Sequence, residues 1–427
     1  MKITKANGKI EYELIESLKR RAGEADKSIV DVVSSIIKGV KDNGDDAVRE
    51  YNVRFDGFVP KKTVVEKNEL QAYLNQVDEE FKSAIINAKN NIYDFHLRQA
   101  QQSWMTTKEN GVIMGQRVRG LHRVGLYVPG GTAAYPSTVL MNAIPAKIAG
   151  VKELIMVTPA GKDGNPNPNI MAAAAVAGVD KVFMVGGAQA VAALAYGTET
   201  IPKVDKIVGP GNIFVATAKK LLYGVVDIDM IAGPSEILIV ADKTADPAFL
   251  AADLMSQAEH DRLASAILLT TSDSIAKQTL NEIEKQIKGL ERHEIIRDSL
   301  NNYGEIIVCE NLEQALHFAN ELAPEHLELC ICEPLKYIGK VDNAGSVFLG
   351  NWSPEPLGDY YAGPNHVLPT NGTARFFSPL SVESFIKKSS FIYYTSAELR
   401  RSKDDIIKLA ETEGLTAHAN SIKVRFE

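Results

Sequence analysis

Two short segments of this sequence place a histidine beside an acidic or amide side chain at a spacing that suits proton transfer or metal binding. Glu325 and His326 are adjacent, between a helical pattern and an apolar strand pattern. A carboxylate beside an imidazole can divide proton transfer, because one group can act on an alcohol and the other on water. Gln257 and His260 are three residues apart on one predicted helix face, so both could approach one ion. Taken alone, each pair is more often a polar surface feature.

Two further histidines follow acidic residues in irregular segments. A loop rich in glycine, proline and aromatic residues carries Asp359 and His366, and the segment beyond the last long helical pattern carries Glu413 and His418. Ordinary surface loops have the same composition. The spacing alone therefore leaves a functional and a structural interpretation open.

Three glycine-rich turns next to short β-like segments could hold a phosphate-bearing ligand. They are Gly186-Gly187-Ala188-Gln189, Gly209-Pro210-Gly211-Asn212 and Gly233-Pro234-Ser235-Glu236. A turn between a strand and a helix presents backbone N–H groups to an anion. The complete G-x-G-x-x-G fingerprint is absent, and α/β proteins need glycine at such turns for structural reasons. Nucleotide binding and a purely structural role are about equally supported.

The composition is typical of a globular protein from a reducing compartment. The 427 residues are 45% hydrophobic and 24% charged, with a net charge of −7, which disfavours binding to nucleic acid. We expect no secretory signal and no membrane span, and with only three cysteines a cytoplasmic location is favoured. Cys330 and Cys332 lie in an apolar β-like run where cysteine usually packs as a small hydrophobe, although a thiol nucleophile is an alternative.

The periodicity predicts an α/β protein that positions these residues around parallel sheets. Helical spacing runs through residues 29–41, 66–73 and 79–102, and short β-rich segments alternate with helical patterns from residue 123. This alternation predicts two Rossmann-like parallel-sheet domains, one inserted in the other, with a helical N-terminal extension and a small C-terminal extension. The expected divisions are an extension (1–24), a discontinuous α/β domain with catalytic and metal residues (25–126 and 237–379), an inserted domain with the nucleotide-binding turns (127–236) and a tail (380–427).

The predicted tail has a helix at residues 397–412 and a final strand at 421–426. These elements are too few to enclose a core of their own. We therefore expect the tail to pack on another part of the chain or on a second copy.

Taken together, these segments resemble the histidinol dehydrogenase family over nearly the whole chain from about Ile29 onward. The strings that carry the resemblance are Gly125-Leu-Tyr-Val-Pro-Gly-Gly131, Val185-Gly-Gly-Ala-Gln-Ala190, Val208-Gly-Pro-Gly-Asn212, Ala232-Gly-Pro-Ser-Glu236, Leu254-Met-Ser-Gln-Ala-Glu-His260, Ala323-Pro-Glu-His-Leu327 and Glu413-Gly-Leu-Thr-Ala-His418. Each string is modest alone, whereas their order and spacing are specific. One local departure is the turn at residues 261–264, which lacks the glycine or proline that many members carry.

The resemblance implies a zinc-dependent homodimer that oxidises L-histidinol through the aldehyde to L-histidine in histidine biosynthesis, with NAD as hydride acceptor. The implied zinc ligands are Gln257, His260, Asp359 and His418; the proton-transfer pair is Glu325 and His326; the residues around NAD are Tyr127, Gln189 and Asn212. The implied substrate contacts are Ser235, Gln257, His260, His326, Asp359, His366, Glu413 and His418. In the family, the tail carrying the last two reaches the active site of the other subunit.

Two alternatives come from other functional classes. A zinc-dependent hydrolase of a small amide could use the same metal ligands to activate water, but it would not need three glycine-rich turns. A non-catalytic nucleotide-sensing protein would keep the turns but would not need Glu325, His326 or the metal ligands.

Overall fold

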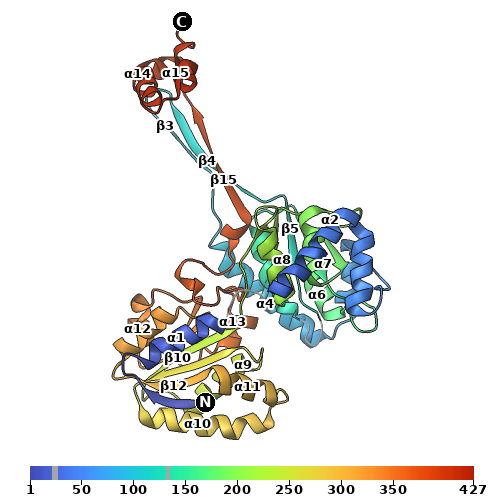
Figure 1. Cartoon of the computed structure of the whole chain (residues 1–427), viewed down its shortest axis with the longest axis vertical. Helices are drawn as coiled ribbons and strands as arrows, with labels where there is room; N and C mark the ends of the chain where they lie inside the picture. The colour runs from blue at the N-terminus through green and yellow to red at the C-terminus, as the bar shows by residue number, and fades with distance from the viewer. Residues whose placement is uncertain (22–26, 131–134) are drawn as a thin grey trace.

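The described residues form two six-stranded sheets and one three-stranded sheet. The computed structural model describes residues 1–21, 27–130 and 135–427, so Gly131 and residues 22–24 of the predicted extension lie outside the described residues. Figure 1 shows two bodies and a long arm that ends at the C-terminus. The strand orders are β1-β12-β11-β10-β13-β14 in sheet A, β2-β7-β6-β5-β8-β9 in sheet B and β15-β4-β3 in sheet C.

Sheet A is parallel throughout. Its strands are β1 (Lys2–Lys5), β10 (Glu236–Ala241), β11 (Ser265–Thr270), β12 (Gly304–Val308), β13 (His326–Cys330) and β14 (Ser346–Leu349). The central strands β10 and β11 are buried along their whole length, which explains why their sequences are continuous apolar runs. One face packs against α9 (Pro247–Ala258), α10 (Asp273–Gln286) and α11 (His293–Tyr303), and the other against α1 (Ile10–Arg21) and α12 (Leu312–Leu322).

Sheet B is parallel except for its edge strand β2, which runs antiparallel to β7. Its strands are β2 (Val64–Glu66), β5 (Arg123–Tyr127), β6 (Glu153–Thr158), β7 (Lys181–Met184), β8 (Lys206–Val208) and β9 (Asp227–Ile228). Helices α2 (Lys27–Asp56), α7 (Gly187–Tyr196) and α8 (Ile213–Leu222) cover one face; α3 (Lys67–Leu74), α4 (Glu79–Leu97), α5 (Pro136–Ile148) and α6 (Pro168–Ala177) cover the other. The strand order reverses at β5, and open α/β sheets bind ligands at such a point.

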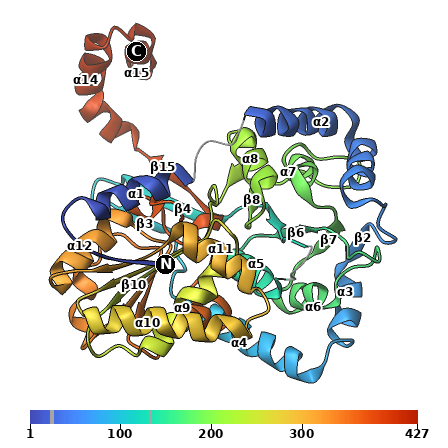
Figure 2. The same cartoon turned by 60° about the horizontal axis from the view of Figure 1, so that its bottom comes forward.

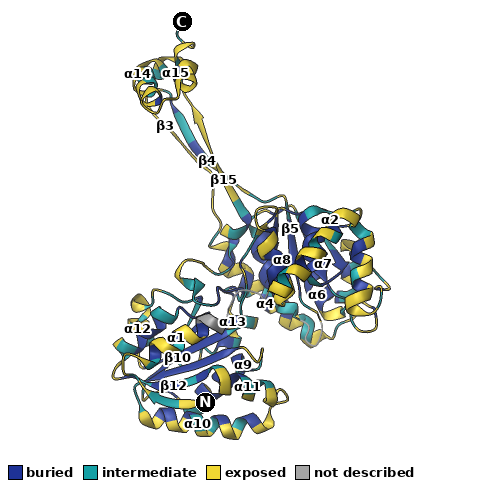
Figure 3. Cartoon of the chain, in the orientation of Figure 1, coloured by how far each residue is buried: buried dark blue, intermediate teal, exposed yellow. Residues whose placement is uncertain are grey.

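The arm is sheet C together with the last two helices. Its antiparallel strands are β3 (Trp104–Thr107), β4 (Ile113–Gly120) and β15 (Ile386–Tyr393), and they lead to α14 (Ser396–Thr412) and α15 (Thr416–Lys423). Figure 3 shows both six-stranded sheets largely buried, whereas most of α14 and α15 is exposed. The arm thus joins two segments that are distant in the sequence and has little core of its own.

The predicted α/β class with parallel sheets is confirmed, but the strands pair differently from the expected division. Residues 25–126 contribute β2 and β5 to sheet B and α2, α3 and α4 to its faces, whereas we expected them in the same domain as residues 237–379. The N-terminal extension, expected to be helical, begins with β1, in which Lys2 pairs with Glu305 of β12. Periodicity predicts an element and its apolar face, but it does not say which sheet that face covers.

Three further elements also differ from the prediction. The predicted final strand at 421–426 is wrong, because α15 runs to Lys423 and no strand follows it in the described chain. A strand needs a partner edge for its backbone groups, whereas a helix satisfies them locally. The helix predicted at 79–102 ends at Leu97, and β13 ends at Cys330, so Cys332 is exposed rather than within the strand. Among the described helices, none has the length and apolarity needed to cross a membrane.

Candidate active site

The amino ends of the strands of sheet A face the carboxyl ends of the strands of sheet B. His326 is the first residue of β13 and Glu236 the first of β10, so sheet A contributes the amino ends of its strands. Two of the three predicted nucleotide turns follow β7 and β8, so sheet B contributes its carboxyl ends. The third, at residues 233–236, leads instead into β10 of sheet A. Figure 2 shows the two bodies side by side, and Thr138 of α5 contacts His366 of the loop after α13 (Glu355–Tyr360). The candidate site lies where these two edges meet.

His326 is held in one tautomer by the backbone. Its Nδ1 lies 2.9 Å from the carbonyl oxygen of Glu236, and because a carbonyl can only accept, Nδ1 carries the hydrogen. Nε2 then holds the lone pair, and this buried atom has no hydrogen-bond partner among the described residues. Burial, the largest effect, lowers the pKa of His326. The ring is therefore neutral near pH 7 and can accept a proton at Nε2.

Two carboxyl groups of α13 face Nε2 of His326. Glu355 Oε1 lies 3.7 Å and Asp359 Oδ1 lies 4.0 Å from that nitrogen. The three residues offer ligand atoms within 4.8 Å of one another. Burial first, and then the charge of Asp359, raises the pKa of Glu355 to about 10. The charge of Asp359 can stabilise a protonated His326, and the three residues together could hold a cation.

The end of α9 lies against α13, where Oγ of Ser256 donates a 3.4 Å hydrogen bond to Oε2 of Glu355, and this end carries an amide and another imidazole. Gln257 is buried, and its Oε1 has no hydrogen-bond partner within the ranges that the structure describes. His260 follows the helix end, where its charge contributes to lowering the pKa of both His326 and His366. An amide oxygen without a partner and an imidazole nitrogen are ligands that suit zinc.

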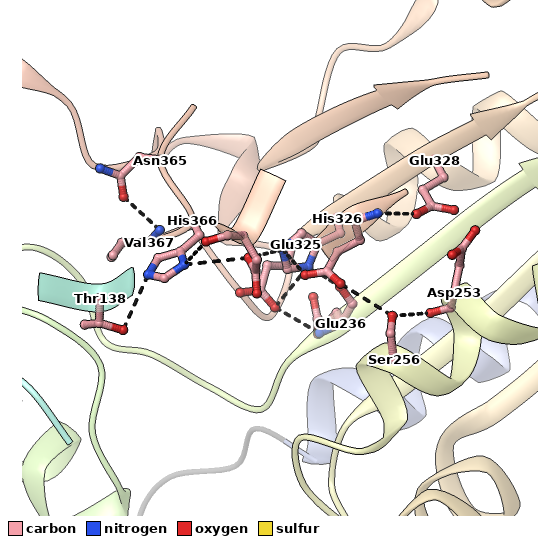
Figure 4. Close-up of polar contacts among 12 residues, drawn as sticks. Thr138, Glu236, Asp253, Ser256, Glu325, His326, Glu328, Asn365, His366 and Val367 are labelled. Atoms are coloured by element: carbon pink, nitrogen blue, oxygen red, sulfur yellow. Dashed lines mark hydrogen bonds and ion pairs between the residues drawn. The ribbon is translucent and has the colours of Figure 1, made fainter. Parts of the chain in front are cut away.

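His366 connects this group to sheet B. Its Nδ1 lies 3.0 Å from the carbonyl oxygen of Asp359 and 3.8 Å from Oδ1 of the same residue. Its Nε2 lies 3.5 Å from Oγ1 of Thr138. Figure 4 shows His366 between Thr138 and the residues around His326. Burial lowers the pKa of His366 most, so this ring is also neutral near pH 7.

Glu325 lies on the Nδ1 side of His326, away from Glu355. Its Oε2 accepts a hydrogen bond of 2.9 Å from the backbone N–H of Glu236 and lies 3.7 Å from Nδ1 of His326. Ser235, a predicted substrate contact, is half-buried directly before β10, and its carbonyl accepts a bond from the N–H of Ser265. Glu325 therefore lies on the Nδ1 side of the imidazole ring, opposite to the Nε2 lone pair of His326.

The predicted nucleotide residues meet at the carboxyl edge of sheet B. The hydroxyl of Tyr127 accepts a 3.0 Å hydrogen bond from the N–H of Gly187, and burial raises the pKa of this phenol to about 12. Gln189 is buried and its Oε1 has no partner in the described part of the chain. A partner-free buried oxygen beside a glycine turn is consistent with a polar ligand there.

A buried ion pair fixes the next nucleotide turn. The N–H of Gly209 donates to Asp229 Oδ2 at 2.7 Å, and the carbonyl of Gly209 accepts from Lys219 Nζ at 3.0 Å. Lys219 and Asp229 form an ion pair whose side chains are only 3% and 1% exposed. A Cβ at position 209 would come within 2.1 Å of the carbonyl oxygen of Tyr127, so only glycine fits. Asn212 caps α8 by accepting from the N–H groups at 214 and 215.

Two predicted site residues lie far from the others within this chain. Glu413 and His418 belong to the exposed end of the arm, beside and within α15, and Figure 1 places that end well away from α13. The structure of one chain therefore brings together His326, Asp359, His366 and the end of α9, but not Glu413 or His418.

The sequence analysis missed Glu355 and the two carboxyl groups behind it. Glu328 Oε1 accepts from the backbone N–H of Glu355 at 2.8 Å, and the side chains of Glu328 and Asp253 share a hydrogen bond. Burial raises the pKa of Asp253 to about 6 and that of Glu328 well above its usual range. One pattern could have found Glu355, because it precedes Asp359 by four residues, the spacing of one helix face.

Comparison with known proteins decides the family. The sequence model described as histidinol dehydrogenase matches residues 19–426. The chain belongs to the histidinol dehydrogenase family. The histidinol dehydrogenase of Clostridium acetobutylicum is 58% identical over 412 residues, or 96% of both chains. That of Lactococcus lactis is 56% identical over 422 residues, or 98% of both chains.

A solved structure supports the fold of this histidinol dehydrogenase family member. The crystal structure of histidinol dehydrogenase from Elizabethkingia anophelis superimposes with a TM-score of 0.91 at 40% identity, covering 99% of this chain and 97% of the other. The similarity thus includes both large sheets and the arm. The resemblance expected from the order of the sequence strings is confirmed.

Proposed function

We propose that this protein oxidises L-histidinol through L-histidinaldehyde to L-histidine in two NAD-linked steps, as part of histidine biosynthesis in the cytoplasm. The single observation that carries the proposal is the environment of His326 Nε2. This buried lone pair lies beside two carboxyl groups of α13, at the edge where sheet A faces the glycine turns of sheet B. A proton acceptor in that place suits the removal of a proton from an alcohol while hydride leaves.

The donors of this chain fit a zinc ion. Gln257 Oε1 is buried without a partner among the described residues, His260 lies near His326 and His366, and Asp359 is 4.0 Å from His326. We assign Gln257, His260 and Asp359 as ligands from this chain, and His418 as the fourth. Zinc bound to them would orient and polarise the substrate. Oxygen and nitrogen ligands without thiolate suit such an exchangeable site.

His326 acts as the general base in both oxidations. Nδ1 donates its hydrogen to the carbonyl of Glu236, so the proton of the substrate hydroxyl goes to Nε2. The imidazolium that forms lies 4.0 Å from Oδ1 of Asp359, whose charge stabilises it. NAD accepts a hydride in each step, and the protein supplies placement and proton transfer.

Glu325 activates the water that hydrates the aldehyde between the two oxidations. An aldehyde must become a hydrate before a second hydride can leave its carbon. Glu325 is 8% exposed and fixed by the N–H of Glu236, so its carboxyl group has a defined position. His326 then removes a proton from the hydrate, as it did from the alcohol.

The dinucleotide binds along the carboxyl edge of sheet B, with Tyr127, Gln189 and Asn212 around it. In this assignment the substrate contacts Ser235, His326 and His366 in addition to the zinc ligands. The glycine turns at the ends of β7 and β8 and the reversal of strand order at β5 support this position.

Glu413 and His418 complete the site of a second copy in a homodimer. The support is their position, because they carry suitable groups at the exposed end of an arm that extends beyond the paired strands β4 and β15. Mixing His418→Ala chains with His326→Asn chains tests this. If the arm acts on the other subunit, a heterodimer has one intact site, and its activity approaches half that of the unaltered dimer. If the arm acts within its own chain, mixing restores nothing.

The reaction is tested by following NAD reduction with L-histidinol as substrate. We expect two NADH per L-histidine formed, loss of turnover with a chelator and recovery with added zinc. Full activity in a preparation shown to lack metal would refute the zinc assignment. Hydrolysis of a small amide without NAD reduction would instead favour the alternative zinc-dependent hydrolase.

A further inference from the structure

The loop that carries His366 is attached to sheet B, although it begins at α13 beside sheet A. Asn91 of α4 donates a 2.9 Å hydrogen bond from Nδ2 to the carbonyl of Tyr361. Val367 and Leu380 are buried in the core cluster formed by α3, α4, α5 and α6. The loop is thus part of the packing of sheet B while its start, at Asp359, contacts His326.

Asn365 makes the central polar contact of this attachment. It is 4% exposed, and its Nδ2 donates to the carbonyl of Met141 in α5 at 2.6 Å. The same Nδ2 lies 3.4 Å from Nε2 of His96 in α4, while Oδ1 accepts from the N–H of Val367 at 2.9 Å. Both ends of the amide are therefore used, one to bind the helices and the other to shape its own loop.

A single turn of α5 contacts both Asn365 and its neighbour His366. Thr138 and Met141 are three residues apart and so lie on the same helix face. Met141 accepts from Asn365, and Thr138 lies 3.5 Å from Nε2 of His366. Nδ1 of His366 faces the carbonyl of Asp359, so Nε2 holds the lone pair and the Thr138 hydroxyl can donate to it.

We propose that Asn365 and Thr138 are positioning residues that hold His366 in register with sheet B. The proposal rests on the proposed function, in which His366 contacts the substrate and sheet B holds the dinucleotide. Because α5 holds His366, the distance between this substrate contact and the edge of sheet B that binds the dinucleotide is fixed. Asp359, the other neighbour of His366, belongs to the sheet A side. A misplacement of about 1 Å is enough to lower the rate of a transfer reaction up to about a hundredfold.

Variants of Thr138 separate this role from simple packing. Thr138→Val keeps the shape but removes the hydroxyl, and it should raise the KM for L-histidinol about fivefold to tenfold and lower kcat. The KM for NAD should not change, because Thr138 is not among the nucleotide contacts. Thr138→Ser keeps the hydroxyl and should recover most of the loss.

Asn365→Ala should also raise the KM for L-histidinol and lower kcat, by larger factors. Asn320→Ala is the matched control, because Asn320 also bridges backbone groups, donating to the carbonyl of Lys340 and accepting from the N–H of Asp342. That variant should lower Tm and leave both KM values unchanged. If Asn365→Ala does not fold, the two Thr138 variants decide the question.

Unaltered KM and kcat for L-histidinol in Thr138→Val, in an otherwise active enzyme, would overturn the inference. So would an Asn365→Ala enzyme that differs from the unaltered protein only in Tm. A failure of the unaltered protein to reduce NAD with L-histidinol would refute the proposed function itself. The two failures are therefore distinguishable.

Discussion

Replacing Lys219 by methionine should destabilise the protein and weaken NAD binding at the same time. The Lys219 ammonium pairs with Asp229 and donates to the carbonyl of Gly209. Because the Asp229 side chain is 1% exposed, water cannot replace the lost ammonium. Removing one partner of a buried pair costs about 3 to 5 kcal/mol.

That free energy corresponds to a fall in Tm of roughly 6 to 20 °C for a domain of this size, measured by thermal denaturation. The turn from Gly209 to Asn212 also loses one of its two anchors, so the KM for NAD should rise about tenfold for about 1.4 kcal/mol of lost positioning. Lys219→Met combined with Asp229→Asn removes the unpaired charge, and it should recover stability without recovering NAD affinity.

Lys206→Met is the matched control. Lys206 Nζ pairs with Asp227 at 2.9 Å on the same sheet, but the Asp227 side chain is 51% exposed, so water can solvate that carboxylate and the loss should be about 1 kcal/mol or less. Equal falls in Tm for Lys219→Met and Lys206→Met would refute the reasoning. An unchanged KM for NAD in Lys219→Met would refute the positioning role of the pair.

The remaining predictions concern the reaction and its surroundings. His326→Asn should slow both oxidations by about a hundredfold or more, whereas Glu325→Gln should still release the first hydride in a single-turnover burst; loss of the burst in both would contradict their separate roles. Cys330→Ala should keep its activity in the NAD assay, because burial raises the pKa of this thiol, and should cost about 1 to 2 kcal/mol in denaturant unfolding. Glu328→Gln should raise Tm, and by more as the pH rises from about 5 to about 7, because burial, and then the charge of Asp253, raises the pKa of Glu328 well above its usual range. The stability linked to a carboxyl group with a raised pKa is present at low pH and lost as the pH rises above its unfolded value. A difference in Tm that is constant with pH would contradict this account.

Much of the fold could be predicted because the central strands are chemically distinct. Strands β10 and β11 are buried along their whole length. In a sequence, such strands appear as short apolar runs bounded by turns. The edge strand β1 could not be predicted, since Lys2 and Lys5 are polar and only its pairing with β12 makes it a strand. Pairing between distant segments depends on tertiary context, which periodicity does not contain.

The candidate site was predictable to the extent that its residues stand in recognisable strings. His326, Asp359 and His366 do converge in the structure, although their roles remain predictions. Glu355 was missed because a glutamate after a proline is typical of any helix start. Its special environment comes from burial between α9 and β13, a consequence of packing.

The pairing of β1 with β12 has a consequence for synthesis of the chain. Lys2 cannot pair with Glu305 until about 300 more residues have been synthesised, which takes roughly 15 to 60 s of translation. During that time all strands of sheet B emerge, so that sheet can form before sheet A. The apolar face of α1, which packs through Leu14 and Leu18 against α12, stays uncovered until sheet A closes. Strand β1 and helix α1 therefore remain accessible to chaperones and proteases until sheet A closes.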